Sequence, residues 1–221
     1  MKLKYFGHSC FSFEHNGTTL LFDPFLKGNT FNIAQPEDVK ANYILVTHGH
    51  GDHLGDAVEI AKASDALIIS TAEIANLVSS EGCRAHAMHI GGKYDFEFGY
   101  VRVTPAFHGA GIPGGHACGF IVKFFDKVIY HAGDTSLFGD MKLLGELETI
   151  DYALLPIGSN FTMGPQDAVV AAKLLQAKHV IPMHYNTWPI IAQDPTVYVD
   201  EVNSKGYAQA IEVKPGSTLD I

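Results

Sequence analysis

The stretch Val46-Thr47-His48-Gly49-His50-Gly51-Asp52-His53 decides how the rest of the chain is interpreted. It follows an apolar segment, residues 43–46, that is typical of a buried strand, and a helical pattern comes after it. His48 and His50 are two residues apart, so in extended backbone their side chains project to the same side. The glycines between them allow a tight turn that gathers four metal-binding side chains within six residues. Imidazole and carboxylate groups suit zinc and neighbouring first-row metals.

A surface loop that is merely rich in histidine and glycine is the alternative explanation for this stretch. Such a loop rarely places alternating imidazoles at the end of a buried strand. A single tetrahedral site that keeps a position open for water needs only three protein ligands. Because the stretch offers four, it indicates ligands that are shared between two metal ions.

The composition is that of a globular protein, and it limits the classes of partner. The chain has 221 residues, of which 47% are hydrophobic and 18% charged, so we expect one domain over residues 1–221 with a substantial core. The net charge of -9 disfavours a nucleic-acid-binding surface, and we predict no nucleic-acid partner. A small anionic substrate is still compatible with it, because metal ions reverse the local field.

Cysteine usage and hydropathy bear on the compartment. Cys10, Cys83 and Cys118 show no CxxC spacing, which favours reduced thiols in a cytoplasmic protein. Polar residues interrupt residues 1–13 before a long apolar run develops, and no later run approaches the roughly 18 apolar residues of a membrane helix. We therefore expect no signal peptide and no membrane partner.

The remaining chain predicts β-strands with helices between them. Asn16-Gly17 is a hairpin signal between two of the first strands. The predicted strands cover residues 3–6, 10–14, 18–22, 43–46, 66–69, 84–88, 101–105, 118–124, 128–130, 152–155 and 179–182, with further β-structure through Ile211 and Leu219. The predicted helices cover residues 56–63, 71–80, 136–147, 165–176 and 194–204. Mixed β-runs of this kind predict an α/β protein with two sheets and helices outside them.

The motif at residues 48–53 resembles the signature of the metallo-β-lactamase superfamily. Further segments follow in the order that this family has: Gly7-His8-Ser9, Asp23-Pro24, Gly133-Asp134-Thr135, residues 161–165 and Met183-His184-Tyr185. The set is similar to a subgroup of small bacterial and archaeal metal-dependent hydrolases related to the ascorbate-phosphate lactonases. The resemblance implies an αββα sandwich, two mixed β-sheets flanked by helices, with the metal ions at one sheet edge.

The resemblance implies the ligands of a first metal ion. His48 and His50 resemble two of them, and His108, which follows the segment 103–107, is expected to be the third. His116 is the nearest rival of His108, but the preceding Gly114-Gly115 indicates a mobile loop. Taken alone, His108 would more often be a structural histidine.

The resemblance likewise implies the ligands of a second metal ion. Asp52 and His53 resemble two of them, and His184 is expected to complete the set. Asp134 resembles the carboxylate that bridges the ions, which lowers the repulsion between cations roughly 3.5–4 Å apart. Taken alone, Asp134 would be a turn residue, with Thr135 capping the next helix.

Other polar residues are second candidates. His8 resembles a residue near the metals, and we predict that it contacts substrate or protonates a leaving group. Asp23 either orients a ligand imidazole or ends a strand as an ordinary Asp-Pro pair. His131 is expected to pack in the core or to support a ligand. The histidines interpreted as structural are His15, His86, His89 and His179.

The implied activity is hydrolysis by a water that two divalent metal ions activate. Bound water loses a proton near pH 7 at such sites, and Asp52 or Asp134 would accept the remaining proton. Zinc is the expected metal, with manganese, iron and nickel as alternatives. The expected substrate is a small ester, lactone or phosphoester, such as a sugar-acid derivative, and the glycine-rich loop Gly109–His116 is expected to act as a lid. A homo-oligomer is compatible with the resemblance.

Two other functions compete with this one. Di-iron oxidoreductases on the same fold resemble a His-x-Glu-x-Asp pattern, whereas this chain has His50 in the place of that glutamate and lacks a flavin-binding domain. A non-catalytic metal-binding or metal-sensing protein would use the same ligands. A complete ligand set with room for water favours catalysis over both.

Overall fold

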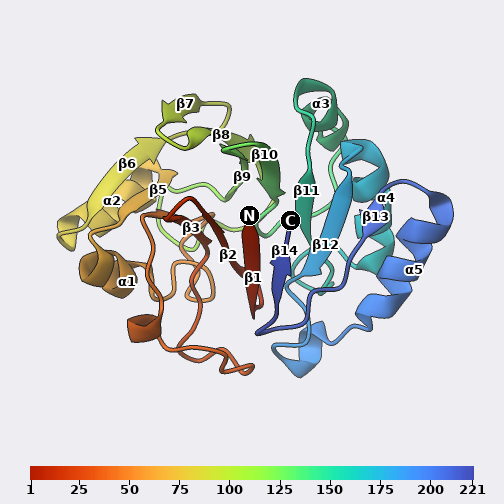
Figure 1. The fold of residues 1–221 in the computed structure, drawn as a ribbon, viewed down its shortest axis with the longest axis horizontal. Coiled ribbons are helices and arrows are strands. Elements are labelled where there is room, and N and C mark those ends of the chain that lie inside the picture. Colours follow the sequence, from red (N-terminus) through yellow and green to blue (C-terminus); the bar gives the residue numbers. More distant parts are fainter.

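Two seven-stranded β-sheets face each other in the computed structural model, which describes residues 1–221. The first sheet has the strand order β14-β1-β2-β3-β4-β5-β6. Its strands are β1 (Lys2–Gly7), β2 (Cys10–His15), β3 (Thr18–Phe22), β4 (Tyr43–Leu45), β5 (Leu67–Thr71), β6 (Arg84–Met88) and β14 (Thr218–Asp220). The N- and C-terminal strands lie side by side in the middle of the view in Figure 1, because β1 pairs antiparallel with β14.

The second sheet has the strand order β13-β12-β11-β10-β9-β8-β7. Its strands are β7 (Lys93–Phe96), β8 (Gly99–Pro105), β9 (Cys118–Phe124), β10 (Lys127–His131), β11 (Tyr152–Pro156), β12 (His179–Met183) and β13 (Gln209–Ala210). Each sheet mixes antiparallel and parallel pairs: β1, β2 and β3 pair antiparallel, and β3 to β6 pair parallel. The sequence prediction of two mixed sheets is confirmed.

Helices cover the outer faces of the two sheets, as Figure 1 shows. They are α1 (Ala57–Ser64), α2 (Ala72–Ser80), α3 (Met141–Leu147), α4 (Pro165–Leu175) and α5 (Pro195–Lys205), with short 3-10 turns at Pro36–Asp38 and Pro189–Ile191. In the view of Figure 1, α1 and α2 lie on one side of the sandwich and α4 and α5 on the other. The predicted αββα arrangement is therefore confirmed. None of the helices combines the length and the apolar character that crossing a bilayer requires.

Alternation along the strands separates an inner core from an outer one. In β3, Leu20 and Phe22 belong to the large core of 44 buried residues, whereas Leu21 belongs to a second cluster of 15. Ile44 and Leu45 of β4 divide in the same way. Successive strand side chains point to opposite faces, so one set packs against the facing sheet and the other against the helices.

The strand directions place many strand ends at a common edge. The two antiparallel steps from β1 to β3 and the parallel steps after it make β1, β3 and β4 run the same way. The pairings of β8, β9, β10, β11 and β12 give the same result in the second sheet. The loops that leave the carboxyl ends of these strands carry the polar motifs found in the sequence.

Most predicted elements are confirmed, and the differences have local causes. Residues 18–22, 84–88 and 118–124 form strands with the predicted bounds. Asn16 and Gly17 have φ of 50° and 76°, as a two-residue hairpin turn requires.

The predicted helix over residues 136–147 is wrong in its first part, because α3 begins at Met141. Ser136 N–H donates to Phe107 O at 3.3 Å, which ties the start of this segment to the neighbouring strand end. Strand β7 was not predicted, although Tyr94 and Phe96 alternate with Lys93 and Asp95, because the strand is only four residues long and mostly exposed.

Candidate metal centre

Polar side chains from both sheets converge at the edge where the parallel strands end. The loop between β4 and α1 supplies His48, His50, Asp52 and His53. The segments after β8, β10 and β12 supply His108, Asp134 and His184. The structure thus brings together all seven side chains that the sequence predicts as metal ligands. It adds His8, which follows β1.

The first group of donors consists of three histidines. His48, His50 and His108 each offer a ring nitrogen, and these atoms lie within 4.8 Å of one another. His48 Nε2 and His50 Nδ1 are only 3.0 Å apart. The rings of His50 and His108 are nearly perpendicular, with centroids 5.2 Å apart. Two facing imidazole nitrogens repel unless a proton or a metal ion lies between them, so this group could hold a cation.

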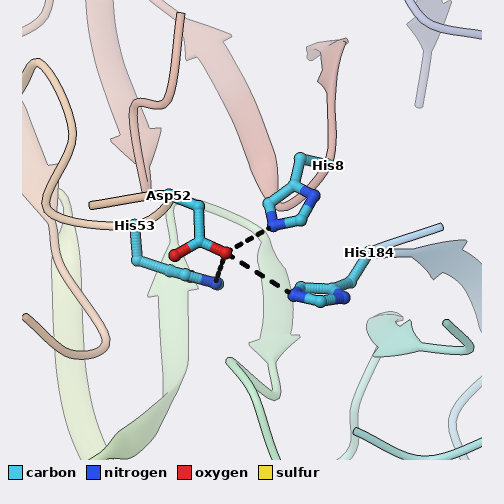
Figure 2. A group of neighbouring side chains, drawn as sticks. All are labelled: His8, Asp52, His53 and His184. Carbon is cyan, nitrogen blue, oxygen red and sulfur yellow. Dashed lines mark hydrogen bonds and ion pairs between the residues drawn. The ribbon is translucent and has the colours of Figure 1, made fainter. Parts of the chain in front are cut away.

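The second group surrounds the Asp52 carboxylate, as Figure 2 shows. His8, Asp52, His53 and His184 each offer an atom within 4.8 Å of the others. Asp52 Oδ2 lies 3.1 Å from His8 Nε2, 3.8 Å from His53 Nε2 and 4.0 Å from His184 Nε2. The four residues come from the segment after β1, the β4–α1 loop and the end of β12.

Asp134 lies between the two groups and contacts members of both. Its Oδ1 is 3.2 Å from His53 Nε2, and its Oδ2 is 3.1 Å from His184 Nε2. On the other side, Oδ2 is 3.5 Å from His108 Nε2 and 4.0 Å from His48 Nε2. A carboxylate in this position has the placement that a bridging ligand needs.

Asp23 and Thr47 orient the imidazoles of the motif. Asp23 Oδ2 is 2.7 Å from His53 Nδ1, and the Thr47 hydroxyl donates to the same oxygen at 2.7 Å. The other Asp23 oxygen accepts the Thr47 backbone N–H at 2.8 Å. The Thr47 hydroxyl also lies 3.0 Å from His48 Nδ1. Because the Nδ1 atoms are held from behind, His53 and His48 present their Nε2 atoms toward Asp134.

His8 lies deeper than its predicted role requires. Its side chain is completely buried, and both ring nitrogens already have partners, Thr187 Oγ1 at 2.8 Å and Asp52 Oδ2 at 3.1 Å. A neutral ring with its proton on Nε2 satisfies both contacts, donating to Asp52 and accepting from Thr187. The His8 ring thus contacts Thr187 and Asp52, and it is not among the residues that line the cavity beside Asp52.

Unusual backbone conformations cluster at the same edge. His8, Asp23 and His184 have positive φ of 58°, 41° and 57°, in the left-handed region that non-glycine residues seldom adopt. His184 N–H donates to His8 O at 2.7 Å, which links the ends of β1 and β12. Strained backbone of this kind concentrates at functional sites, because surrounding contacts hold it in place.

Opposite charges shift the pKa values of the central groups. Burial opposes ionisation of Asp134, but His184 and His53 outweigh it and hold the pKa of this carboxyl well below its usual range. Burial also opposes protonation of His53, yet Asp134 and Asp23 raise its pKa well above the ordinary value. Asp134 is therefore a carboxylate at neutral pH, the form that binds metal ions.

Three other imidazoles, those of His8, His48 and His108, have lowered pKa values, whereas that of His53 is raised. Burial lowers the pKa of His48, and the nearby His53 lowers it further. The pKa of His108 is also lowered, mainly by burial. Burial and the neighbouring His184 lower the pKa of His8 to about 4. These rings are neutral at pH 7, which leaves a nitrogen lone pair on each for a metal ion or a hydrogen bond.

Several buried polar atoms at the centre have no hydrogen-bond partner within the chain. They include His53 Nε2, Asp134 Oδ1 and both ring nitrogens of His184. The contacts of His53 Nε2 and His184 Nε2 with Asp134, at 3.2 and 3.1 Å, are close but do not have hydrogen-bond geometry. Native proteins rarely leave buried polar atoms unpaired, because each costs roughly 1–3 kcal/mol. Nitrogen and carboxylate donors that converge without partners fit divalent metal ions of the first transition row.

A cavity of about 470 Å³ opens onto this group of side chains. Its polar lining is formed by His50, Gly51, Asp52, His108, Asp134 and His184. Its other walls are aromatic, formed by Phe25, Phe161 and Trp188, and no lysine or arginine lines it. Sequence reasoning gave none of these three residues a role in the site, although Phe161 begins the segment 161–165 that the resemblance singled out. A single aromatic residue in a loop has no pattern that distinguishes it from core packing.

The loop after β8 lies elsewhere than the sequence suggested. Ala110 O accepts the Gly49 N–H at 2.8 Å, and Gly111 packs directly against the backbone of His50. No residue of 109–116 lines the cavity, and in this structure the loop braces the motif from outside. His116 lies apart from the centre, in a group with Glu73 and His89.

His131 and three of the histidines interpreted as structural lie outside every possible metal group. His131 is buried, stacks on Phe22 with centroids 4.9 Å apart, and contacts Ser9 O at 2.9 Å. It belongs to none of the possible metal groups. Neither do His15, His86 and His179, which lie beside aromatic rings.

Known proteins resemble this chain along its length. The family model described as a β-lactamase superfamily domain matches residues 2–184. A UPF0173 metal-dependent hydrolase of Natranaerobius thermophilus is 51% identical over 221 residues, which cover all of both chains. A second, from Bacillus thuringiensis subsp. konkukian, is 51% identical over 92% of this chain and 94% of its own. The chain belongs to the UPF0173 metal-dependent hydrolases of the β-lactamase superfamily.

A solved structure extends this likeness to three dimensions. Igni18, a metallo hydrolase from the hyperthermophilic archaeon Ignicoccus hospitalis, is 37% identical to this UPF0173 hydrolase. The superposition covers 99% of this chain and 97% of Igni18, with a TM-score of 0.93. The sequence-based assignment to the metallo-β-lactamase superfamily is therefore confirmed, and so is the expectation of a metal-dependent hydrolase.

Proposed function

We propose that this metal-dependent hydrolase uses two divalent metal ions, with zinc as the preferred metal, to cleave a small uncharged ester or lactone. The two groups of donors on either side of Asp134 support the number of ions. His48, His50 and His108 would hold one ion, Asp52, His53 and His184 the other, and Asp134 would bridge them. When bound, such ions lower the pKa of water to about 7 and stabilise negative charge on the reacting oxygen.

Asp52 is the carboxylate best placed to take up the proton of the attacking water. It lines the cavity, its side chain is 22% exposed, and the ring of His8 fixes its Oδ2. Burial opposes its ionisation, but the hydrogen bond from His8 and the charge of His53 lower its pKa below the usual value. Asp134 is only 3% exposed and lies among four histidines, which suits bridging better than proton transfer.

The proposed substrate class rests on the residues that form the cavity wall. Phe25, Phe161 and Trp188 form its apolar part, and no lysine or arginine faces it. Proteins that recognise phosphate or carboxylate groups usually supply arginine, lysine or a cluster of backbone N–H groups for them. A substrate with an apolar or aromatic group beside its carbonyl fits these walls better than a phosphoester or a sugar acid.

Turnover of a matched substrate panel tests the proposal. Aryl-acetate esters, aliphatic lactones with an apolar side chain, and bis-p-nitrophenyl phosphate are compared with zinc-loaded and chelator-treated protein. We expect zinc-dependent hydrolysis of the uncharged carbonyl compounds and at least about tenfold lower kcat/KM for the phosphodiester, because no lysine or arginine of the wall pairs with its phosphate group. Preferred cleavage of the phosphodiester would overturn the substrate class, and zinc binding without any turnover would favour a metal sensor.

Phe161 offers a variant that isolates the aromatic wall. Phe161→Ala is expected to raise KM for aryl esters several-fold with little change in kcat, since burying an aromatic group is worth roughly 1–3 kcal/mol. Leu147→Ala is the matched control, because Leu147 is 64% exposed, beside 51% for Phe161, and lies away from the cavity at the end of α3. Equal effects of both substitutions would contradict the role of the wall.

A further inference from the structure

A third group of possible metal donors lies outside the centre just described. Glu73, His89 and His116 each offer one donor atom, and the three atoms lie within 4.8 Å of one another. Glu73 is in the first turn of α2, His89 follows β6, and His116 precedes β9. Segments that are far apart in the sequence therefore present two imidazoles and one carboxylate to a common point.

The chemistry of this group suits a first-row divalent cation. Two histidines and one glutamate are a frequent set of protein ligands for zinc, with water in the fourth position. Ligand atoms around a tetrahedral zinc ion lie about 3.4 Å apart, given bond lengths near 2.1 Å. The rings of His89 and His116 are exposed, with centroids 5.4 Å apart, so small rotations of these side chains would close the remaining gap.

An independent observation at Glu73 points to a ligand. Its Oε2 is buried and has no hydrogen-bond partner in the chain. Glu73 also forms no ion pair, whereas surface carboxylates such as Glu59 and Glu146 have lysine partners. A carboxylate oxygen that is shielded from water and unpaired is one that a cation would stabilise.

The group sits where a metal ion would fix a functional loop. His116 ends the loop 109–116, in which Ala110 accepts the N–H of Gly49 and Gly111 packs on His50. Glu73 lies in α2, and His89 directly follows β6, the last strand of the first sheet. An ion bound by all three residues would tie this loop to that layer and so brace the motif that carries His48 and His50.

We propose that Glu73, His89 and His116 form a separate, structural binding site for a zinc-type divalent cation. Binding would replace one hydrogen bond of the free chain, in which the Ile90 N–H donates to His89 Nδ1 at 2.9 Å. The site requires no residue of the catalytic centre, and its occupation is measured without reference to activity.

Zinc content per chain tests the site. Full-length protein is stripped with chelator, dialysed against micromolar Zn²⁺ and analysed for metal, as wild type and as His116→Ala, Glu73→Gln and His15→Ala. We expect His116→Ala and Glu73→Gln each to hold one zinc ion fewer than the wild type. The control His15→Ala removes a histidine that belongs to no metal group and is expected to keep the wild-type content.

Amide hydrogen exchange of residues 109–117 gives the second readout. Zinc is expected to slow exchange in the wild type and in His15→Ala by at least about tenfold more than in His116→Ala. Unchanged zinc content in both cluster variants, or an equal loss in His15→Ala, overturns the site. If His116→Ala fails to fold, Glu73→Gln decides alone, because it removes the charge and keeps the side-chain shape.

Discussion

The two sheets of this hydrolase share a strand order, β1 to β6 in one and β8 to β13 in the other, but contribute different chemistry. Each begins with three antiparallel strands, β1 to β3 and β8 to β10, and continues with parallel strands that helices connect. Each also has a strand added next to its first one, β14 in one sheet and β7 in the other. Equivalent positions in the two halves can therefore be compared directly.

The two sheets differ most in the loop that follows the fourth strand, counted from β1 in the first sheet and from β8 in the second. In the first half it is the β4–α1 loop, which carries the four donors of the motif. In the second half it is the β11–α4 loop, which carries no donor and supplies Phe161 to the cavity wall. The second half contributes its three donors singly, after β8, β10 and β12.

Neither half of the molecule contains the site by itself. The motif supplies donors in one continuous stretch, while His108, Asp134 and His184 reach it only when the sheets pack face to face. Metal binding and packing of the sandwich are thus linked, and ligand removal on either side has the same consequence. The following experiments test this linkage, beginning with the largest expected effect.

Removal of one ligand from each half is expected to have equal and large effects. His50→Ala and Asp134→Ala should each lower kcat/KM at least about 1,000-fold, because the stabilisation that metal ions supply amounts to several kcal/mol. The measurement is steady-state hydrolysis of the preferred ester with metal analysis of each variant. The double variant should be no worse than either single one. Retained activity in Asp134→Ala alone would show that the second half is dispensable.

Asp23 and Asp134 follow equivalent strands, β3 and β10, but only Asp134 faces the cavity. Asp23→Asn is expected to weaken metal binding about 10–100-fold, because the asparagine holds His53 Nδ1 less firmly. Competition with a chromophoric chelator measures the affinity. Asp134→Asn, which alters a proposed ligand, serves as the reference and should lose more. Equal losses in both variants would contradict the distinction between an orienting residue and a ligand.

Gly158 and Gly51 lie in the equivalent loops after β11 and β4. Substitutions at these positions compare how tightly the two loop backbones are packed. A Cβ at Gly158 would lie 2.1 Å from His184 O, whereas a Cβ at Gly51 meets nothing within 4 Å. Gly158→Ala is expected to lower the free energy of unfolding by roughly 1–3 kcal/mol, while Gly51→Ala stays within about 0.5 kcal/mol of wild type. Urea denaturation of metal-loaded protein provides both values. A neutral Gly158→Ala would show that His184 has room to shift.

The smallest effect concerns the pH dependence of stability in metal-free protein. His8 and His108 follow the equivalent strands β1 and β8, and both have lowered pKa values, that of His8 being about 4. Unfolded histidines take up protons below pH 6.5 while these remain neutral, so stability falls as the pH decreases toward 4. His53, with a raised pKa, contributes full stability below pH 6.5 and loses it at higher pH, outside this window.

For a single histidine, the expected decrease in the free energy of unfolding between pH 6 and pH 5 is about 1 kcal/mol. Urea denaturation of chelator-treated protein at the two pH values measures it. His8→Asn should show the smaller loss by this amount, and His108→Asn should change less because the His108 side chain is 15% exposed. Identical pH slopes in wild type and His8→Asn would contradict the lowered pKa of His8.

The donors of the first half could be predicted from the sequence more directly than those of the second half. The motif at residues 48–53 is local, so its spacing alone indicated metal ligands at the end of a strand. His108, Asp134 and His184 are single residues whose meaning depends on the packing of two sheets, and only the family resemblance singled them out. Most strands were predicted because buried β-runs are continuous and apolar.

The parts that escaped prediction lack such patterns. The aromatic wall comes from three separate loops, and the depth of His8 depends on Thr187, which lies 179 positions away in the chain. The loop 109–116 was predicted to be a lid from its glycines, but these permit close packing against His50. Glycine content alone does not distinguish a flexible segment from one that must approach another backbone closely.

Anomalous X-ray diffraction at the zinc edge, on crystals of the zinc-loaded wild type, tests the central claim most directly. Two peaks are expected at this edge of the sandwich, one on each side of Asp134 and roughly 3.5–4 Å apart. One peak would belong to the group of His48, His50 and His108, and the other to that of Asp52, His53 and His184. A single peak, or none near Asp134, would contradict a dinuclear centre built by both halves of the molecule.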